Sequence, residues 1–258
     1  MSRRLRVILV VLAAIALVTV AAVVVWRVVL RDTATPATID DALARYRAAA
    51  AAGDTPIPAG VYVYTTTGSE SISALGGTTH EYPPRSTITV TSASCGMELR
   101  WDVLTTRSTT WEVCTGGSNG VLQQLAGWTE RHAFFGQDDA TTWRCTGSPW
   151  LVDATVASEA ADHACDGGDA SQAGTVAVVG EEAVDVGGVA VETVRVRLEA
   201  QEEGASRGPL VEERWVERET GLPVRMSYRV RTDNDSVIGD VVFEEAYDLT
   251  LLSLEPRT

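Results

Sequence analysis

The sequence contains no lysine, and all 21 of its basic side chains are arginine. This absence excludes P-loop nucleotide sites, Schiff-base enzymes, protein kinases and Ser-x-x-Lys acylation centres, because each requires a lysine amine at a fixed position. Histidine and phenylalanine are also scarce, with three residues of each among 258. Several large enzyme classes are therefore ruled out before any motif is considered.

Charged residues are absent from a long N-terminal run. From Val7 to Trp26 the only polar side chain is that of Thr19, and a helix of this length spans about 30 Å, one hydrocarbon thickness. Three arginines precede the run and two follow it, which favours a cytoplasmic N-terminus. We therefore expect residues 1–6 to be cytoplasmic and residues 7–30 to form an uncleaved transmembrane anchor in the cell membrane. A cleavable signal peptide is the alternative.

Basic residues are few in the rest of the chain. Residues 32–258 hold 16 arginines against all 35 acidic residues, so this part is strongly acidic. Nucleic-acid binding depends on clustered Lys and Arg, and we expect no nucleic-acid partner. The acidity is typical of a solvated surface.

Cysteine occurs four times, always beyond the anchor, at Cys95, Cys114, Cys145 and Cys165. An even number in an extracytoplasmic domain favours disulfides. Residues 97–104 and 108–113 alternate like the strands of a hairpin, which would bring Cys95 opposite Cys114 and leave Cys145 for Cys165. The alternative for the second pair is a metal site with His163, but the paired spacing of such sites is lacking. We expect two disulfides, no metal and no cofactor.

The hydrophobic period changes from helical to strand-like along the domain. Thr38 is a suitable N-cap for an Ala-rich helix that runs to Ala52, after a linker at residues 31–37. From Gly60 onward the chain alternates or is rich in β-branched residues, and its connections are too short for repeated βαβ crossovers. We expect residues 38–258 to form one mainly β (α+β) domain, a single curved, half-barrel-like antiparallel sheet with an N-terminal helix.

Three stretches are less regular. Residues 121–135 fit either a helix or a strand. Residues 166–174 and 201–209 are polar and contain glycine, and we expect both to be loops.

Candidates for catalysis are weak. Residues 116–120 match the Gly-x-Ser-x-Gly motif, with Ser118 as the nucleophile, but that motif requires a parallel sheet with helical crossovers. A hairpin loop is the preferred interpretation. His80, His132 and His163 form no metal-type or catalytic spacing, and we interpret them as surface or satisfied loop residues. We expect no catalytic residue and no enzyme.

Tryptophan is plentiful, with seven residues. Large aromatic side chains cover the apolar faces of sheets and also line clefts, and the first role is the preferred interpretation. If the sheet is concave, its ligand-binding candidates are Trp101, Trp215, Tyr228 and Phe243. The arginines that alternate with them, such as Arg229, are expected to face solvent and to bind nothing.

One hairpin resembles a known family. Residues Glu213 to Arg225, ERWVERETGLPVR, are similar to a hairpin of the lipoprotein-carrier-like (LolA/RseB-like) half-barrels. Gly221 supplies a positive φ and Pro223 starts the return strand. The resemblance implies a periplasmic or membrane-tethered protein whose curved sheet shelters acyl chains or a partner. The composition also resembles that of actinobacterial envelope proteins, although the chain lacks a lipobox cysteine.

Three functional hypotheses follow. The first is a membrane-anchored extracytoplasmic module that binds an apolar, lipid-like ligand or a partner segment. The second is a structural or regulatory interaction protein of the envelope with a filled core, and the third is a hydrolase through Ser118. An apolar cavity of a few hundred Å3 favours the first, a solid core the second, and a histidine beside Ser118 the third.

Overall fold

The computed structural model describes residues 12–21, 23, 32, 34–49, 55–116, 120–153, 160–236 and 239–258. Beyond helical residues near the N-terminus, its helices are α2 (Ile39–Ala49) and the 3-10 turn η1 (Ala74–Gly76). The strands of the described part are β1 (Gly60–Ile72), β2 (Thr78–Glu81), β3 (Arg85–Ala93), β4 (Gly96–Leu104), β5 (Arg107–Thr115), β6 (Val121–Phe134), β7 (Gln137–Val152), β8 (Ala161–Asp166), β9 (Ala170–Val186), β10 (Val189–Gly204), β11 (Ser206–Glu217), β12 (Pro223–Asn234) and β13 (Val241–Leu251). The mainly β, antiparallel prediction is confirmed.

The structure covers the expected anchor at residues 7–30 in part. Residues 12–21 and 23 are helical, and the others of this range lie outside the described residues. In the described part of the chain, no helix has both the length and the apolar character needed to span a membrane.

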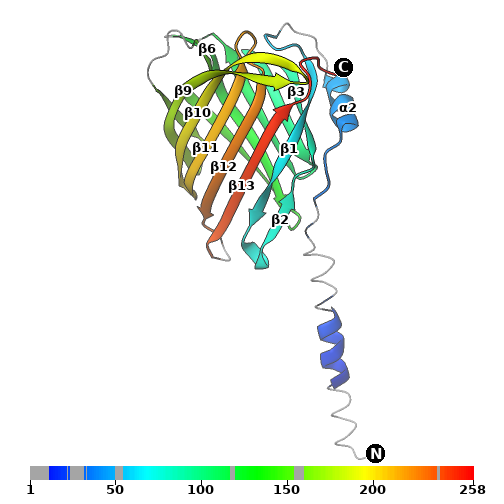
Figure 1. The fold of residues 1–258 in the computed structure, drawn as a ribbon. Coiled ribbons are helices and arrows are strands. Elements are labelled where there is room, and N and C mark those ends of the chain that lie inside the picture. The colour runs from blue at the N-terminus through cyan, green and yellow to red at the C-terminus, as the bar shows by residue number, and fades with distance from the viewer. Residues whose placement is uncertain are drawn as a thin grey trace, which may run out of the picture.

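The sheet closes into a barrel, so the half-barrel prediction is wrong (Figure 1). The cause is the length of β1. Its residues 60–65 pair with β3, and its residues 64–72 pair with β13, the last strand. The ring therefore contains β1 and β3 to β13, while β2 pairs only with the end of β1. We call the end of the barrel that carries η1 and the β12–β13 turn the lower end, as it is drawn in Figure 1.

Helix α2 lies on the outside of the barrel (Figure 1). Thr38 caps it as expected, since the Asp41 amide donates to Thr38 Oγ1 at 3.1 Å and the Thr38 hydroxyl donates to Asp41 at 2.6 Å. Arg45 anchors the helix through Nη2, 2.7 Å from the carboxylate of Asp102 on β4. Residues 50–54, where the helix is expected to end, lie outside the described residues.

The two stretches expected to be loops are mostly strand. Of residues 166–174, only 167–169 form a turn, between β8 and β9, and residues 201–209 form the end of β10 and the start of β11 with a turn at residue 205. The prediction was wrong because polar and glycine residues are typical of loops, whereas here they belong to paired strands whose polar side chains face water or, as Gln172 does, the cavity in the barrel. The ambiguous residues 121–134 are strand β6. The β11–β12 hairpin has the expected positive φ, 81°, at Gly221.

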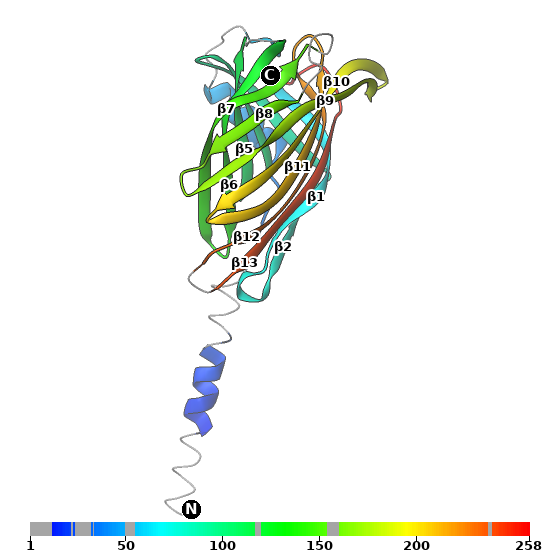
Figure 2. The same cartoon turned by 90° about the vertical axis from the view of Figure 1, so that its left-hand side faces the viewer.

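The pairing of β7 with β8 is the shortest join in the described barrel wall. It consists of three residue pairs, whereas β9 and β10 form sixteen. The pairs are Arg144 with Asp166, Cys145 with Cys165 and Thr146 with Ala164. Figure 2 shows the short β8 and its turn to β9 ending higher on the wall than the strands on either side.

Candidate functional site

Both expected disulfides are present. Cys95 bonds Cys114 beside the β4–β5 hairpin, and Cys145 bonds Cys165 across the β7–β8 join. The alternation that placed the hairpin also set its register, since Gly96 lies opposite Cys114. The metal-site alternative is wrong because Cys145 and Cys165 are bonded to each other.

Charged side chains occupy the interior of the barrel. Arg107 begins β5 with a side chain that is 2% exposed. Its Nε and Nη2 atoms each lie 2.9 Å from a carboxylate oxygen of Glu245 on β13, and the Tyr82 hydroxyl also donates to that carboxylate. Its Nη1 donates to Ser108 O at 2.7 Å and to Thr109 Oγ1 at 2.6 Å. A bidentate pair between a guanidinium and a carboxylate is the strong form of such a contact.

A second buried carboxylate joins two histidines at the lower end. Glu70 accepts from His80 Nδ1 at 2.9 Å and from His132 Nδ1 at 2.7 Å, and its side chain is fully buried. Burial alone would raise the pKa of Glu70, but the hydrogen bonds with His132 and His80 outweigh it and lower the pKa to about 2. Burial and Arg107 oppose charge on His132, yet Glu130 and Glu70 raise its pKa to about 9. His132 is therefore a cation at neutral pH.

The linker reaches this cluster. Asp32 Oδ2 lies 2.8 Å from His80 Nε2, and both side chains are almost fully buried. Burial lowers the pKa of His80, but Glu70 and Asp32 overcome that effect and raise it. His80 thus connects the described part of the linker to the barrel through one imidazole.

A small cavity lies in the barrel interior. The space open to the centres of water molecules is about 30 Å3, enough for one or two waters. Aromatic rings and leucines form much of its wall, together with the charged residues Arg107, Glu130, Glu212 and Arg214. The lining is therefore mixed, and its four charged side chains distinguish it from the apolar cavity expected of a lipid-binding module.

Glu212 and Arg214 project into this cavity from one face of β11. Arg214 Nε lies 3.0 Å from Glu212 Oε1, Arg214 Nη2 donates to Pro149 O at 3.2 Å, and the guanidinium lies 4.4 Å above the Trp150 ring. Burial raises the pKa of Glu212 despite Arg214, and burial lowers the pKa of Arg214. Both residues prefer to be less charged than they would be in water.

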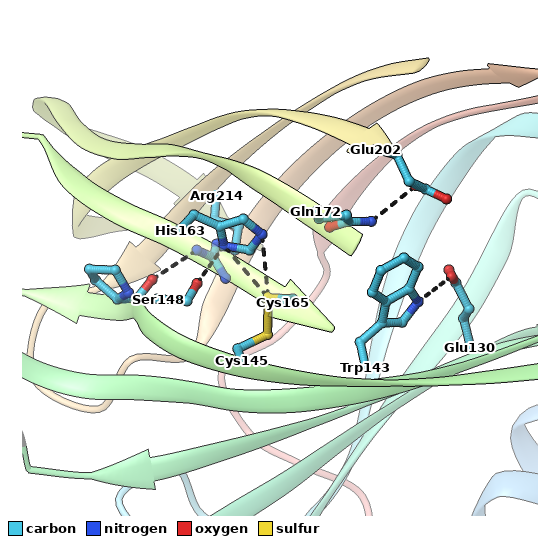
Figure 3. Close-up of a disulfide and its surroundings, with 10 residues drawn as sticks. Glu130, Trp143, Cys145, Ser148, His163, Cys165, Gln172, Glu202 and Arg214 are labelled. Carbon is cyan, nitrogen blue, oxygen red and sulfur yellow. Dashed lines mark hydrogen bonds between the residues drawn. A yellow bond between two sulfur atoms is a disulfide. The ribbon is translucent and has the colours of Figure 1, made fainter. Parts of the chain in front are cut away.

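The Cys145–Cys165 disulfide borders the same interior (Figure 3). His163, which lines the cavity, lies between Ser148 and Cys165, with Nδ1 2.8 Å from Ser148 Oγ and Nε2 3.4 Å from Cys165 Sγ. Burial lowers the pKa of His163 to about 4, so it is neutral at pH 7. Trp143 stacks on Trp128 at 5.3 Å beside the disulfide and donates to Glu130 at 2.8 Å.

Ser148 and His163 do not form an active site. The Ser148 side chain is buried and does not line the cavity, and no carboxylate contacts His163 among the described residues. A serine nucleophile needs access to substrate and a strong base, and neither condition holds here. Ser118 lies outside the described residues.

The four expected ligand-binding residues do not share one surface. Trp101 and Tyr228 lie inside the barrel, each against Tyr247, with ring centres 4.5 and 5.1 Å away. Phe243 lies at the lower end, 4.9 Å from His132. Trp215 follows the cavity-lining Arg214 on β11 and therefore faces outward. Its ring is held between Arg195 and Arg225, 4.9 and 4.6 Å away.

The sequence does contain a signal for some of the interior charges, because alternate residues of a strand face the same side. On β11, Glu212 and Arg214 lie at alternate positions between Leu210 and Val216, on the same, buried side of the strand. A charged residue in the apolar phase of a strand is a signal for a buried ion pair. The histidine interpretation is wrong for His80 and His132, which meet at Glu70 from distant strands.

Comparison with known proteins gives one structural similarity. No protein-family model matches the chain, and no curated protein matches it. Among solved structures, the chain is similar to the hypothetical lipoprotein YmcC from Escherichia coli, with 13% identity and a TM-score of 0.33. The alignment covers 83% of this chain and 97% of that one.

Proposed function

We propose that the chain is a membrane-tethered interaction protein of the cell envelope, which acts through the outside of its barrel and carries no lipid inside it. The observation that supports this proposal is the filled interior. Ligand pockets usually measure about 300–1,000 Å3, and the cavity here has room for about 30 Å3.

The charges around the cavity also oppose an apolar ligand. An acyl chain beside Arg107, Glu130, Glu212 and Arg214 would remove water from these groups without offering a hydrogen bond. Each polar group so treated costs about 1–3 kcal/mol. A carrier of apolar molecules would have to bear that penalty at several residues at once.

Native mass spectrometry of the full chain released from detergent micelles tests the absence of an interior ligand. We expect the mass of the bare chain. Two variants locate any lipid that is retained: Leu198→Trp fills the cavity, and Val179→Trp changes an exposed position on the neighbouring strand. Lipid lost from Leu198→Trp but kept by Val179→Trp would contradict the proposal.

Photo-cross-linking from the outer wall tests the positive half of the proposal. A cross-linking amino acid at the exposed Arg229 on β12 or Asp139 on β7 should trap a partner from one side of the barrel and not from the other. Absence of any cross-link from every exposed strand position, in cells that produce the full chain, would remove the support for an interaction protein.

A further inference from the structure

The described part of the linker is docked on the barrel wall. Thr35 and Ala37 form backbone hydrogen bonds of 2.8 and 3.1 Å with the β4–β5 hairpin. Asp32, three residues before Thr35, contacts His80 at the lower end with a side chain that is 6% exposed. The linker is therefore fastened at two heights of the wall, and the lower fastening is the one next to the expected anchor.

Covalent geometry limits how far the lower end can lie from that anchor. Leu30, its last residue, is two residues before Asp32, and two residues span at most about 7 Å when fully extended. Even from Trp26, where the apolar run ends, six residues span at most about 20 Å. The upper end is farther away by the height of the wall, roughly 25 Å for tilted strands of 11 residues such as β13. In a tethered chain the lower end is therefore the end nearer to the bilayer.

Two turns at the lower end hold apolar residues in an unfavourable backbone conformation. Leu75 in η1 and Phe135 between β6 and β7 have φ angles of 53° and 52°. Among the described residues, they are the ones other than glycine that have a positive φ, which is unfavourable for a residue with a Cβ. A two-residue hairpin turn usually has Asn, Asp or Gly in place of Phe135. Backbone strain of this kind points to a function of the side chains that it positions.

The turn that carries Leu75 is fixed, and its side chain reaches solvent. The Ser73 amide donates to Val242 O at 2.9 Å, and the Val242 amide donates to Ser73 Oγ at 2.8 Å. The Leu75 side chain is 43% exposed. A leucine held in this way has apolar surface to bury, and its backbone loses little freedom when it meets an apolar phase.

We propose that the lower rim, which we define as η1 and the β6–β7 turn, is a membrane-contacting surface, and that the docked linker holds it on the bilayer with Leu75 among the lipid headgroups. This inference rests on the membrane tether of the proposed function. The rim fits zwitterionic lipid, because Asp138 and Asp139 follow Phe135 and are exposed, and anionic headgroups would repel them. The outer wall and the upper end remain free for protein partners.

The test is quenching of a fluorescent dye by nitroxide-labelled lipid headgroups, in the full chain reconstituted in phosphatidylcholine vesicles. The four native cysteines form the two disulfides, so a single introduced cysteine carries the dye. Leu75→Cys and Gln137→Cys place it on or beside the lower rim. Val189→Cys places it at a position that is 55% exposed, beside the β9–β10 turn at the upper end (Figure 2). We expect severalfold stronger quenching at the two lower positions than at the upper one.

Flotation of the same vesicles separates this inference from the proposed function. A chain that does not float with the vesicles has no membrane tether, and the proposed function itself fails. If the chain floats but the dye at position 75 is quenched no more than the dye at position 189, the tether stands and the membrane-contacting rim is refuted. Protection of the dye at position 75 from aqueous iodide, without quenching by the lipid, would assign the rim to a protein contact and would also refute it.

A matched pair of variants tests the docked linker. Asp32→Ala removes the contact with His80, so the linker is held only from Thr35 onward and the reach from Leu30 grows to about 17 Å. Quenching at position 75 should therefore fall, while flotation is unchanged. Asp40→Ala removes an exposed carboxylate from α2 and should leave the quenching as it is. Equal quenching in the two variants would show that the Asp32 contact does not hold the rim on the bilayer.

Discussion

Removal of the Arg107 charge should destabilise the barrel far more than removal of a surface arginine. In Arg107→Met the bidentate contacts at 2.9 Å are lost, while Glu245 keeps its charge in a site where its side chain is 1% exposed. Breaking one side of a buried pair costs about 3–5 kcal/mol. For a domain of this size, each kcal/mol lowers the Tm by about 2–4 °C, so a fall of about 6–20 °C is expected.

The matched control is Arg229→Met. Arg229 also pairs with a carboxylate on β13, at 2.8 Å from Asp248, but the two side chains are 51% and 40% exposed. Such pairs contribute about 0–1 kcal/mol, so the Tm should change by no more than a few degrees. Urea and thermal unfolding of the full chain in mild detergent, monitored by circular dichroism, give the Tm and the unfolding free energy of both variants.

A double variant identifies the cause of the loss. Arg107→Met with Glu245→Gln removes both charges, and the carboxylate that the single change leaves uncompensated disappears. The double variant should therefore lose less unfolding free energy, by about 1–3 kcal/mol, than the sum of the losses in the two single variants. If the single change costs no more than Arg229→Met, or if the two changes are additive, the buried-pair reasoning is refuted.

Three further predictions concern pH, backbone packing and the outer wall. The folded pKa of His132, about 9, lies above its ordinary 6.5, so its contribution to stability is complete below pH 6.5 and is lost as the pH rises to 9. His163 has the opposite shift, to about 4, so its contribution is complete above pH 6.5 and is lost as the pH falls to 4. Unfolding free energies between pH 4 and 9 should therefore peak near 6.5, and a flat profile would contradict both assignments. Gly174→Ala should destabilise the β9–β10 pairing by about 1–3 kcal/mol, because the new Cβ would lie 2.1 Å from Glu199 O; a variant as stable as the wild type in urea would contradict this packing. Trp215→Ala should cost about 3–5 kcal/mol in unfolding experiments because it empties a site in which the ring is 4% exposed and packs between Arg195 and Arg225, yet leave the bare mass in native mass spectrometry unchanged.

The strands were predictable because their local pattern is regular. Alternation located β4, β5, β10 and β12, and the short distance between β4 and β5 fixed the pairing of Cys95 with Cys114. Alternation records which residues face the core but not which strand is the neighbour. The pairing of β1 with β13, which turns the open sheet into a barrel, therefore left no local signal.

The interior site was not predictable for a different reason. Arg107 on β5 and Glu245 on β13 come from distant strands and meet only after the barrel has closed. By themselves such residues look like parts of a solvated face, because burial of a charge is favourable only when its partner is present. Glu212 and Arg214 are the exception, since both lie in the apolar phase of one strand.

The closure of the ring by β1 and β13 has a consequence for folding order. Every other join in the ring links strands that are neighbours along the chain, with β2 as the only interruption, and so forms by local hairpin steps. The β1–β13 ladder must wait until almost the entire domain has emerged from the ribosome or the translocation machinery. Until then β1 exposes an unpaired edge, and such edges associate with other chains. The chain should therefore be most prone to aggregation in the interval before β13 has emerged and paired with β1.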